Sequence, residues 1–204
     1  LVGRVIARPY IYRDGVYTRT SDRRDYSVDP PSDTILDLMK GAGYEVDCVG
    51  KIHDIFNGRG MVSYVHTVSN MDGVDKTLDY MKKAGNGIIF TNLVDFDAKY
   101  GHRRDPEGYA RAIEEFDARI PEIISAMRSD DVLILTADHG NDPTFKGWNH
   151  TREYIPVLAY GKKIKAGAEI GTRKSFADIS ASICEYFGIE NTLSGTSFID
   201  EILV

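Results

Sequence analysis

Three of the five histidines in the 204-residue sequence lie close to aspartates in a pattern that could bind metal. Asp97 and His102 are five residues apart, Asp138 and His139 are adjacent, and His150 follows eleven residues later. Carboxylate oxygen and neutral imidazole nitrogen together suit Mn, Zn or Fe, whereas Mg and Ca sites are usually built from oxygen alone. The residue types therefore predict a transition-metal site.

The number of candidate ligands favours two ions over one. Five ligands exceed what one four-coordinate catalytic ion needs if it is to keep an open position. Two ions about 3.5–4 Å apart can stabilise both the attacking and the leaving oxygen of an in-line displacement. Such chemistry is typical of phosphoryl transfer.

The remaining polar residues near these motifs have simpler interpretations. A lone histidine is more often a hydrogen-bonded structural residue than a ligand. His53 and His66 have no carboxylate partner at a predicted strand end, so we expect them to be surface or supporting groups. Asp95 alternates with Asp97 in the strand period and is expected to face the other side of the sheet or to support a ligand.

The elements that would position these motifs alternate between strands and helices. Helices are predicted from Asp33 to about Gly41, from Asp72 to about Lys83, from Asp105-Pro106 to about Met127, and over 175–186; strands are predicted over 44–49, 87–93, 132–136 and 155–160. This alternation is typical of an α/β fold with a mainly parallel sheet flanked by helices. Two of the metal-binding motifs follow strands, at the edge where such sheets collect their ligands.

Composition and the start of the chain limit the function further. A net charge of -6 and a pI near 5.4 give no overall attraction to nucleic acid or to anionic membranes. No apolar run has the roughly 18–20 residues of a membrane span, and no leader opens the chain, so we expect a cytoplasmic protein. Cys48 and Cys184 are expected to be reduced. The arginine-rich segment 1–30 is expected to end a separate small domain, with 31–204 forming part of the core domain.

Five segments of the sequence match a known family pattern: Val2 to Pro9, Val49 to Phe56, Ser69 to Asp75, Asn92 to Asp105 and Thr136 to Asp142. They resemble segments of bacterial phosphopentomutases, which belong to the alkaline phosphatase superfamily. The Asp138-His139-Gly140 element alone indicates only the superfamily, whereas the segments around Lys51 and Asn70 narrow the resemblance. The similarity covers essentially the whole chain, but it begins near the middle of a typical family member. We therefore expect a C-terminal half with a partial fold, opening with the end of a small α/β cap domain.

The resemblance implies a site and a reaction. One ion would be held by Asp97, His102 and His150, and a second by Asp138 and His139 with an N-terminal aspartate that has no match here. Two divalent ions, with Mn as the expected metal, would serve a phosphothreonine-enzyme route between (deoxy)ribose 1-phosphate and 5-phosphate. The nucleophilic threonine also has no match here, so no catalytic nucleophile is expected in this chain.

The resemblance also implies where the substrate lies. In the family, the residues at the substrate face match Arg4, Ile6 and Lys51 of this sequence. The expected partners are a pentose phosphate and the missing N-terminal half of the same protein. The alternatives are a metal-dependent phosphatase or phosphoglycerate mutase of the same superfamily, or a non-catalytic metal-binding fragment.

Overall fold

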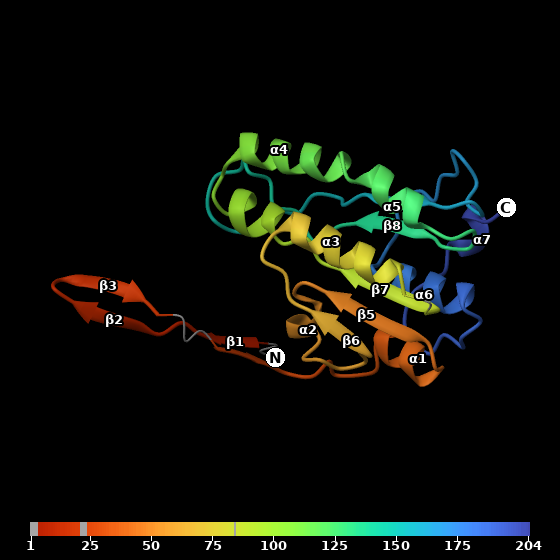
Figure 1. Cartoon of the computed structure of the whole chain (residues 1–204), viewed down its shortest axis with the longest axis horizontal. Helices are drawn as coiled ribbons and strands as arrows, with labels where there is room; N and C mark the ends of the chain where they lie inside the picture. Colours follow the sequence, from red (N-terminus) through yellow and green to blue (C-terminus); the bar gives the residue numbers. More distant parts are fainter. Residues whose placement is uncertain (1–3, 21–23, 84) are drawn as a thin grey trace.

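A parallel three-stranded sheet forms the centre of the body in the computed structural model, which describes residues 4–20, 24–83 and 85–204 (Figure 1). Its strand order is β6 (Ser63–Val65), β5 (Glu45–Val49) and β7 (Gly87–Thr91). Val49 pairs with Val65 on one side and with Thr91 on the other. The three strands therefore end together at one carboxyl edge.

Helices α1 (Ile35–Gly41), α2 (Ile52–Ile55), α3 (Asn70–Met81) and α6 (Ala177–Tyr186) surround this sheet. The main core cluster lies between α1, β5 and α6 and includes Leu36, Met39, Val46, Cys48 and Cys184. Burial of these apolar side chains is the main force that holds the helices on the sheet. Both cysteines are free and buried, as expected for reduced thiols.

Two helix starts differ from the predicted ones. The N-cap of α1 is Thr34, whose backbone N–H donates to the Asp37 carboxylate at 2.8 Å, and the N-cap of α3 is Ser69. The Ser69 hydroxyl accepts a hydrogen bond from the Asp72 backbone N–H at 3.2 Å. The helix starts predicted at Asp33 and Asp72 were therefore wrong, because the nearby hydroxyl residues Thr34 and Ser69 take the capping positions.

The predicted helix after Asp105 is two helices. Asp105 caps α4 (Pro106–Asp117) as predicted, accepting from the Gly108 N–H at 2.8 Å. The chain then breaks before α5 (Ile120–Ala126), whose first turn contains Pro121. Proline lacks the N–H that a continuing helix would need, and it fits a first turn.

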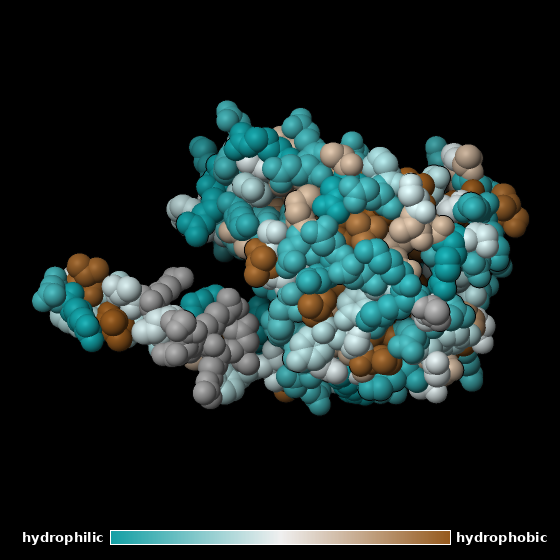
Figure 2. Space-filling view, viewed as in Figure 1, coloured by the Kyte–Doolittle hydropathy of each residue, from teal (hydrophilic) through white to brown (hydrophobic). Residues whose placement is uncertain are grey.

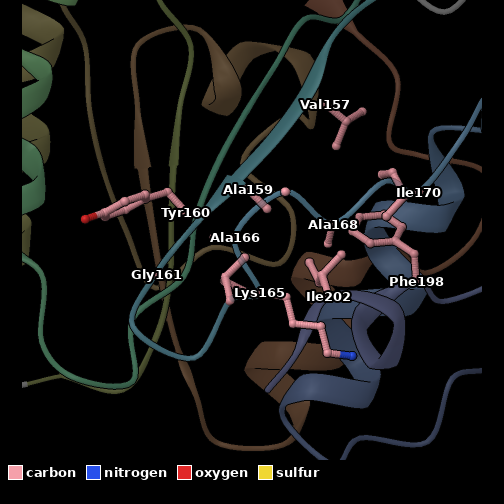
Figure 3. A pocket seen from close by; sticks show the side chains of 12 residues that line it. Val157, Ala159, Tyr160, Gly161, Lys165, Ala166, Ala168, Ile170, Phe198 and Ile202 are labelled. Atoms are coloured by element: carbon pink, nitrogen blue, oxygen red, sulfur yellow. The ribbon is translucent and has the colours of Figure 1, made fainter.

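The last two strands form a separate antiparallel pair. β8 (Leu133–Thr136) pairs with β9 (Val157–Tyr160), so the expectation of a mainly parallel sheet is met by β6, β5 and β7 but not by these two. A second core cluster joins β9 to α7 (Ile199–Ile202). A cavity of about 300 Å³ lies beside it (Figure 3), and Lys165 is the one charged residue among its described lining.

The first segment of the chain forms an antiparallel arm that extends from the body (Figure 1). Its strands are β1 (Arg4–Ala7), β2 (Tyr10–Arg13), β3 (Val16–Arg19) and β4 (Arg24–Ser27); β1 pairs with β4 and β2 with β3. Asp14 and Gly15 turn the β2–β3 hairpin with φ angles of 50° and 81°, and Asp-Gly is a preferred pair for a hairpin turn that needs positive φ at both residues. Apolar atoms are exposed at the outer end of the arm (Figure 2).

The arm touches the body through α2, because the Ser27 hydroxyl donates to the Asp54 carbonyl at 2.9 Å. No helix in the described part of the chain has the length and apolar character needed to cross a membrane.

Candidate metal centre

Asp97, His102 and His150 form a triangle of ligand atoms. The Asp97 Oδ1 atom lies 3.4 Å from His102 Nε2 and 3.2 Å from His150 Nε2, and the two Nε2 atoms are 3.1 Å apart. Ligands about 2.0–2.1 Å from a tetrahedral ion are separated by about 3.3 Å. The triangle therefore has the size that three ligands of one ion would give.

Asp138 and His139 lie beside this triangle. The imidazole of His139 stacks on that of His150, with ring centroids 3.8 Å apart and an interplanar angle of 17°. Asp97, His139 and His150 also offer ligand atoms that all lie within 4.8 Å of one another. The Asp138 carboxylate is 3.6 Å from His139 Nε2 and its side chain is 66% exposed. The structure thus brings all five predicted ligands together, and their roles as ligands stay predictions.

Three loops supply these side chains. Asp97 lies in a π-helical turn, η1 (Phe96–Gly101). The N–H of His102, the residue after this turn, donates to the Asp97 carbonyl at 2.9 Å. Asp138 and His139 follow β8 after one intervening residue, Ala137. His150 is brought opposite them because the Thr151 N–H donates to the Gly140 carbonyl at 3.0 Å.

Backbone carbonyls orient two of the imidazoles. The Nδ1 atom of His102 lies 3.0 Å from the Trp148 carbonyl oxygen, and that of His139 lies 3.2 Å from the Gly140 carbonyl oxygen. A carbonyl can only accept, so each Nδ1 carries the hydrogen and each Nε2 keeps its lone pair. Both Nε2 atoms are therefore prepared to bind a cation.

Asn141 and Arg104 support the site and were missed in the sequence. The Asn141 amide donates to Asp97 Oδ1 at 2.6 Å, and Arg104 donates to the Asn141 side-chain oxygen at 2.9 Å. A Cβ atom on Gly101 would lie 2.5 Å from the Asn141 amide nitrogen, so this contact requires glycine. The guanidinium also donates to four backbone carbonyls, those of residues 101, 142, 147 and 149. No motif in the sequence signals such long-range contacts.

Asp95 supports a helix and does not join the cluster. Its backbone N–H donates to the Asn70 side-chain oxygen, and its carboxylate accepts from the Asn70 backbone N–H, both at 2.9 Å. This reciprocal pair fixes the start of α3. Asp95 and Asp97 lie at a helical turn and not in a strand, so the strand alternation expected for them was wrong, and Asp95 supports α3 through Asn70.

A cleft of about 1750 Å³ connects the candidate metal centre with the two sheets. All residues of β7 and all residues of β8 line it, and among the described strands β7 pairs only with β5 and β8 only with β9. Arg4 and Lys51 line the same cleft as Asp97, Asp138, His139 and His150. Ile6, in β1, is not among the described lining residues.

Tyr109 lines the cleft close to the acidic residues. Burial raises the pKa of its phenol above the ordinary value, and the negative charges of Asp97 and Glu153 raise it further. Tyr109 therefore stays a neutral hydrogen-bond donor at neutral pH.

The fold and the clustered ligands fit a metal-dependent enzyme, and the comparison of sequences gives its class. Residues 20–191 match the profile of the Metalloenzyme superfamily, and the chain belongs to that family. The structure also resembles a crystal structure of phosphoglycerate mutase from Leishmania mexicana, determined at low cobalt concentration. The TM-score is 0.59 at 16% sequence identity, over 79% of this chain and 38% of that one. This likeness supports the α/β fold alone.

The most informative relatives are proteins named phosphopentomutase. The chain is 60% identical to that of Alkaliphilus oremlandii over 99% of its own length and 52% of the relative's length. It is 59% identical to that of Clostridioides difficile over 97% of its length and 51% of the relative's. The predicted resemblance is confirmed, and the chain spans about half the length of the curated relatives it matches.

Proposed function

We propose that this chain is the C-terminal half of a phosphopentomutase, which interconverts (deoxy)ribose 1-phosphate and (deoxy)ribose 5-phosphate. The observation that carries the proposal is the triangle of Asp97, His102 and His150 at the edge of a large cleft, with His139 stacked beside it. Identity of about 60% to proteins named phosphopentomutase supports this reaction over others that the superfamily performs.

Two divalent Mn²⁺ ions are the proposed cofactors. Asp97, His102 and His150 would hold the first, while Asp138 and His139 would hold the second with an aspartate from the rest of the protein. The mixed oxygen and nitrogen donors suit Mn²⁺ better than they suit Mg²⁺, whose sites are usually built from oxygen alone. When bound, such ions neutralise charge on a transferring phosphoryl group and lower the pKa of a hydroxyl nucleophile.

The substrate would bind in the cleft between β7 and β8. A pentose phosphate is a dianion, and the Arg4 guanidinium suits it because its planar fork can donate two charge-assisted hydrogen bonds. Lys51 would add a second positive charge from the start of α2, and Ile6 would pack on the sugar. The arm, within residues 1–30, would end a cap domain that keeps water from the phosphorylated enzyme.

The rest of the longer protein would complete this cleft. It would supply the threonine nucleophile and the remaining metal ligand, along with strands that pair with the edges of β7 and β8 that no described strand occupies. Unpaired edges are otherwise a liability for self-association, which supports a strand partner in this place. We place such an enzyme in the cytoplasm.

The test compares isomerisation with phosphate release by the full-length protein. We expect isomerisation to dominate, and expect His150→Ala to abolish it while Lys146→Ala, an exposed change in the same loop, leaves it intact. The 204-residue chain alone is expected to have no mutase activity. Dominant hydrolysis, or full isomerisation by His150→Ala, would contradict the proposal.

A further inference from the structure

We propose that His53, Asp54 and His66 form a separate cation site that binds a borderline divalent ion of the Zn²⁺ class. Each of the three residues offers one ligand atom, and all these atoms lie within 4.8 Å of one another. None of the three belongs to the Asp97 cluster. The inference does not depend on the proposed reaction.

The spacing of the ligand atoms suits one ion. His53 Nδ1 lies 3.3 Å from Asp54 Oδ1, which is long for a hydrogen bond but matches the separation of about 3.3 Å between two ligands of a tetrahedral ion. The centroids of the His53 and His66 rings are 5.8 Å apart, at an interplanar angle of 73°. We expected no carboxylate at a strand end to partner these histidines; in the structure Asp54 supplies a carboxylate from α2 instead.

The parallel sheet brings the two histidines together. The Gly50 N–H donates to the Val65 carbonyl at 2.9 Å, so the chain leaves β5 and β6 at the same edge. His53 then lies in α2, directly after the turn that follows β5, and His66 follows β6 without an intervening residue. This is the edge where open α/β sheets collect their ligands.

Neighbouring residues hold the three ligands in place. The Tyr64 ring stacks on His53 with centroids 3.9 Å apart, and meets the His66 ring edge-on at 5.5 Å. The Ser27 hydroxyl fixes the backbone of Asp54 through its carbonyl. The ligands are thus positioned by packing as well as by chain connectivity.

The donor set and the exposure define which ion fits. Two imidazoles and one carboxylate favour Zn²⁺, Ni²⁺ or Cu²⁺ over Mg²⁺ and Ca²⁺. The His53 and Asp54 side chains are 30% and 36% exposed, and His66 is exposed, so an ion can enter and water can complete its coordination. A bound ion would tie α2 to the end of β6 and so steady the turn that begins at Lys51, the N-cap of α2.

The test measures Zn²⁺ bound by protein in which the Asp97 cluster has been removed by His139→Ala and His150→Ala. We expect one equivalent of Zn²⁺ to remain after dialysis, and expect His66→Gln or Asp54→Asn to weaken its binding at least tenfold. Tyr64→Phe is the matched control, since it keeps the ring stack and removes no proposed ligand. Replacing Zn²⁺ with Co²⁺ should give visible absorption bands of a four-coordinate site, which His66→Gln removes.

Two outcomes would overturn the site. The first is that the protein without the Asp97 cluster retains no Zn²⁺. The second is that His66→Gln and Asp54→Asn bind Zn²⁺ as tightly as Tyr64→Phe. Circular dichroism of each metal-free variant separates loss of a ligand from loss of folding. Asp54→Asn nearly preserves the shape of the side chain, so this variant tests the ligand with little risk to the fold.

Discussion

Arg104 provides the sharpest test of how the candidate metal centre is held together. Its guanidinium donates five hydrogen bonds, one to the Asn141 side chain and four to backbone carbonyls on both sides of the site. These bonds join the segment that carries Asp97 and His102 to the loop that carries His150. We expect Arg104→Ala to let the loop that carries His150 move away from Asp97 and His102.

The expected magnitude follows from the supporting role of this side chain. A single hydrogen bond from a charged donor contributes roughly 1.5–3 kcal/mol, but five bonds from one side chain are not additive. Loss of a group that orients metal ligands typically lowers metal affinity about 10- to 100-fold, which corresponds to roughly 1.4–2.8 kcal/mol. Alanine keeps a Cβ atom at a position where φ is 54°, so the backbone strain is unchanged and the loss reflects the guanidinium alone.

The assay is a Mn²⁺ titration in which binding is monitored by calorimetry or electron paramagnetic resonance. Arg103→Ala is the matched control, because Arg103 is the exposed neighbour and makes no hydrogen bond or ion pair that the structure describes. Arg104→Lys should resemble the alanine variant more than the parent, since one ammonium group cannot reach five acceptors. Equal Mn²⁺ affinity for Arg104→Ala and Arg103→Ala would refute this reasoning.

Three further predictions concern single residues in the core and the site. Gly101→Ala should lower stability in urea by about 1–3 kcal/mol, because its Cβ would lie 2.5 Å from the Asn141 amide. A hydrogen bond from the backbone N–H of Thr196 lowers the pKa of Asp178, so the ionised carboxylate stabilises the fold above its unfolded pKa, and this stabilisation is lost as pH falls through the folded pKa. Asp178→Asn should therefore lower the free energy of unfolding by about 2 kcal/mol at pH 7. In urea titrations this difference should shrink below about pH 4. Burial raises the pKa of Cys48 to about 12, so a thiol reagent at pH 8 should label it only after denaturation.

The sequence was sufficient for elements with strong local signals. Apolar runs of strand length located β5, β7, β8 and β9, and Asp105-Pro106 located the start of α4. β6 was missed because three residues are too few to show a period. The direction of β9 was also beyond local reasoning, since antiparallel pairing with β8 depends on the path of the loop between them.

The candidate site divides in the same way. Residue types beside strand ends were enough to select five side chains that the structure brings together. The groups that hold them could not be found, because the contacts of Arg104 with Asn141 and of His102 with Trp148 span 37 and 46 residues. Ordinary arginine and asparagine residues in loops give no signal until the fold places their partners.

The two halves of the candidate centre differ in how far this chain prepares them. Asp97, His102 and His150 already lie 3.1–3.4 Å apart, and the contacts of Asn141 and Arg104 hold them there. Asp138 has a largely exposed carboxylate, and among the described residues it has only His139 as an ion-pair partner, at 3.6 Å.

This difference predicts unequal binding of two ions by the 204-residue chain. A preformed set of ligands loses less conformational entropy on binding than a mobile one, so the first ion should bind well before the second. In the chain carrying His66→Gln, which removes the proposed His53–Asp54–His66 site, a Mn²⁺ titration should saturate near one equivalent, and His102→Ala should remove that equivalent while Asp138→Ala leaves it. Binding of two equivalents with similar affinity would contradict this argument. It would mean that the Asp138–His139 position is as well prepared for an ion as the closely spaced ligands Asp97, His102 and His150.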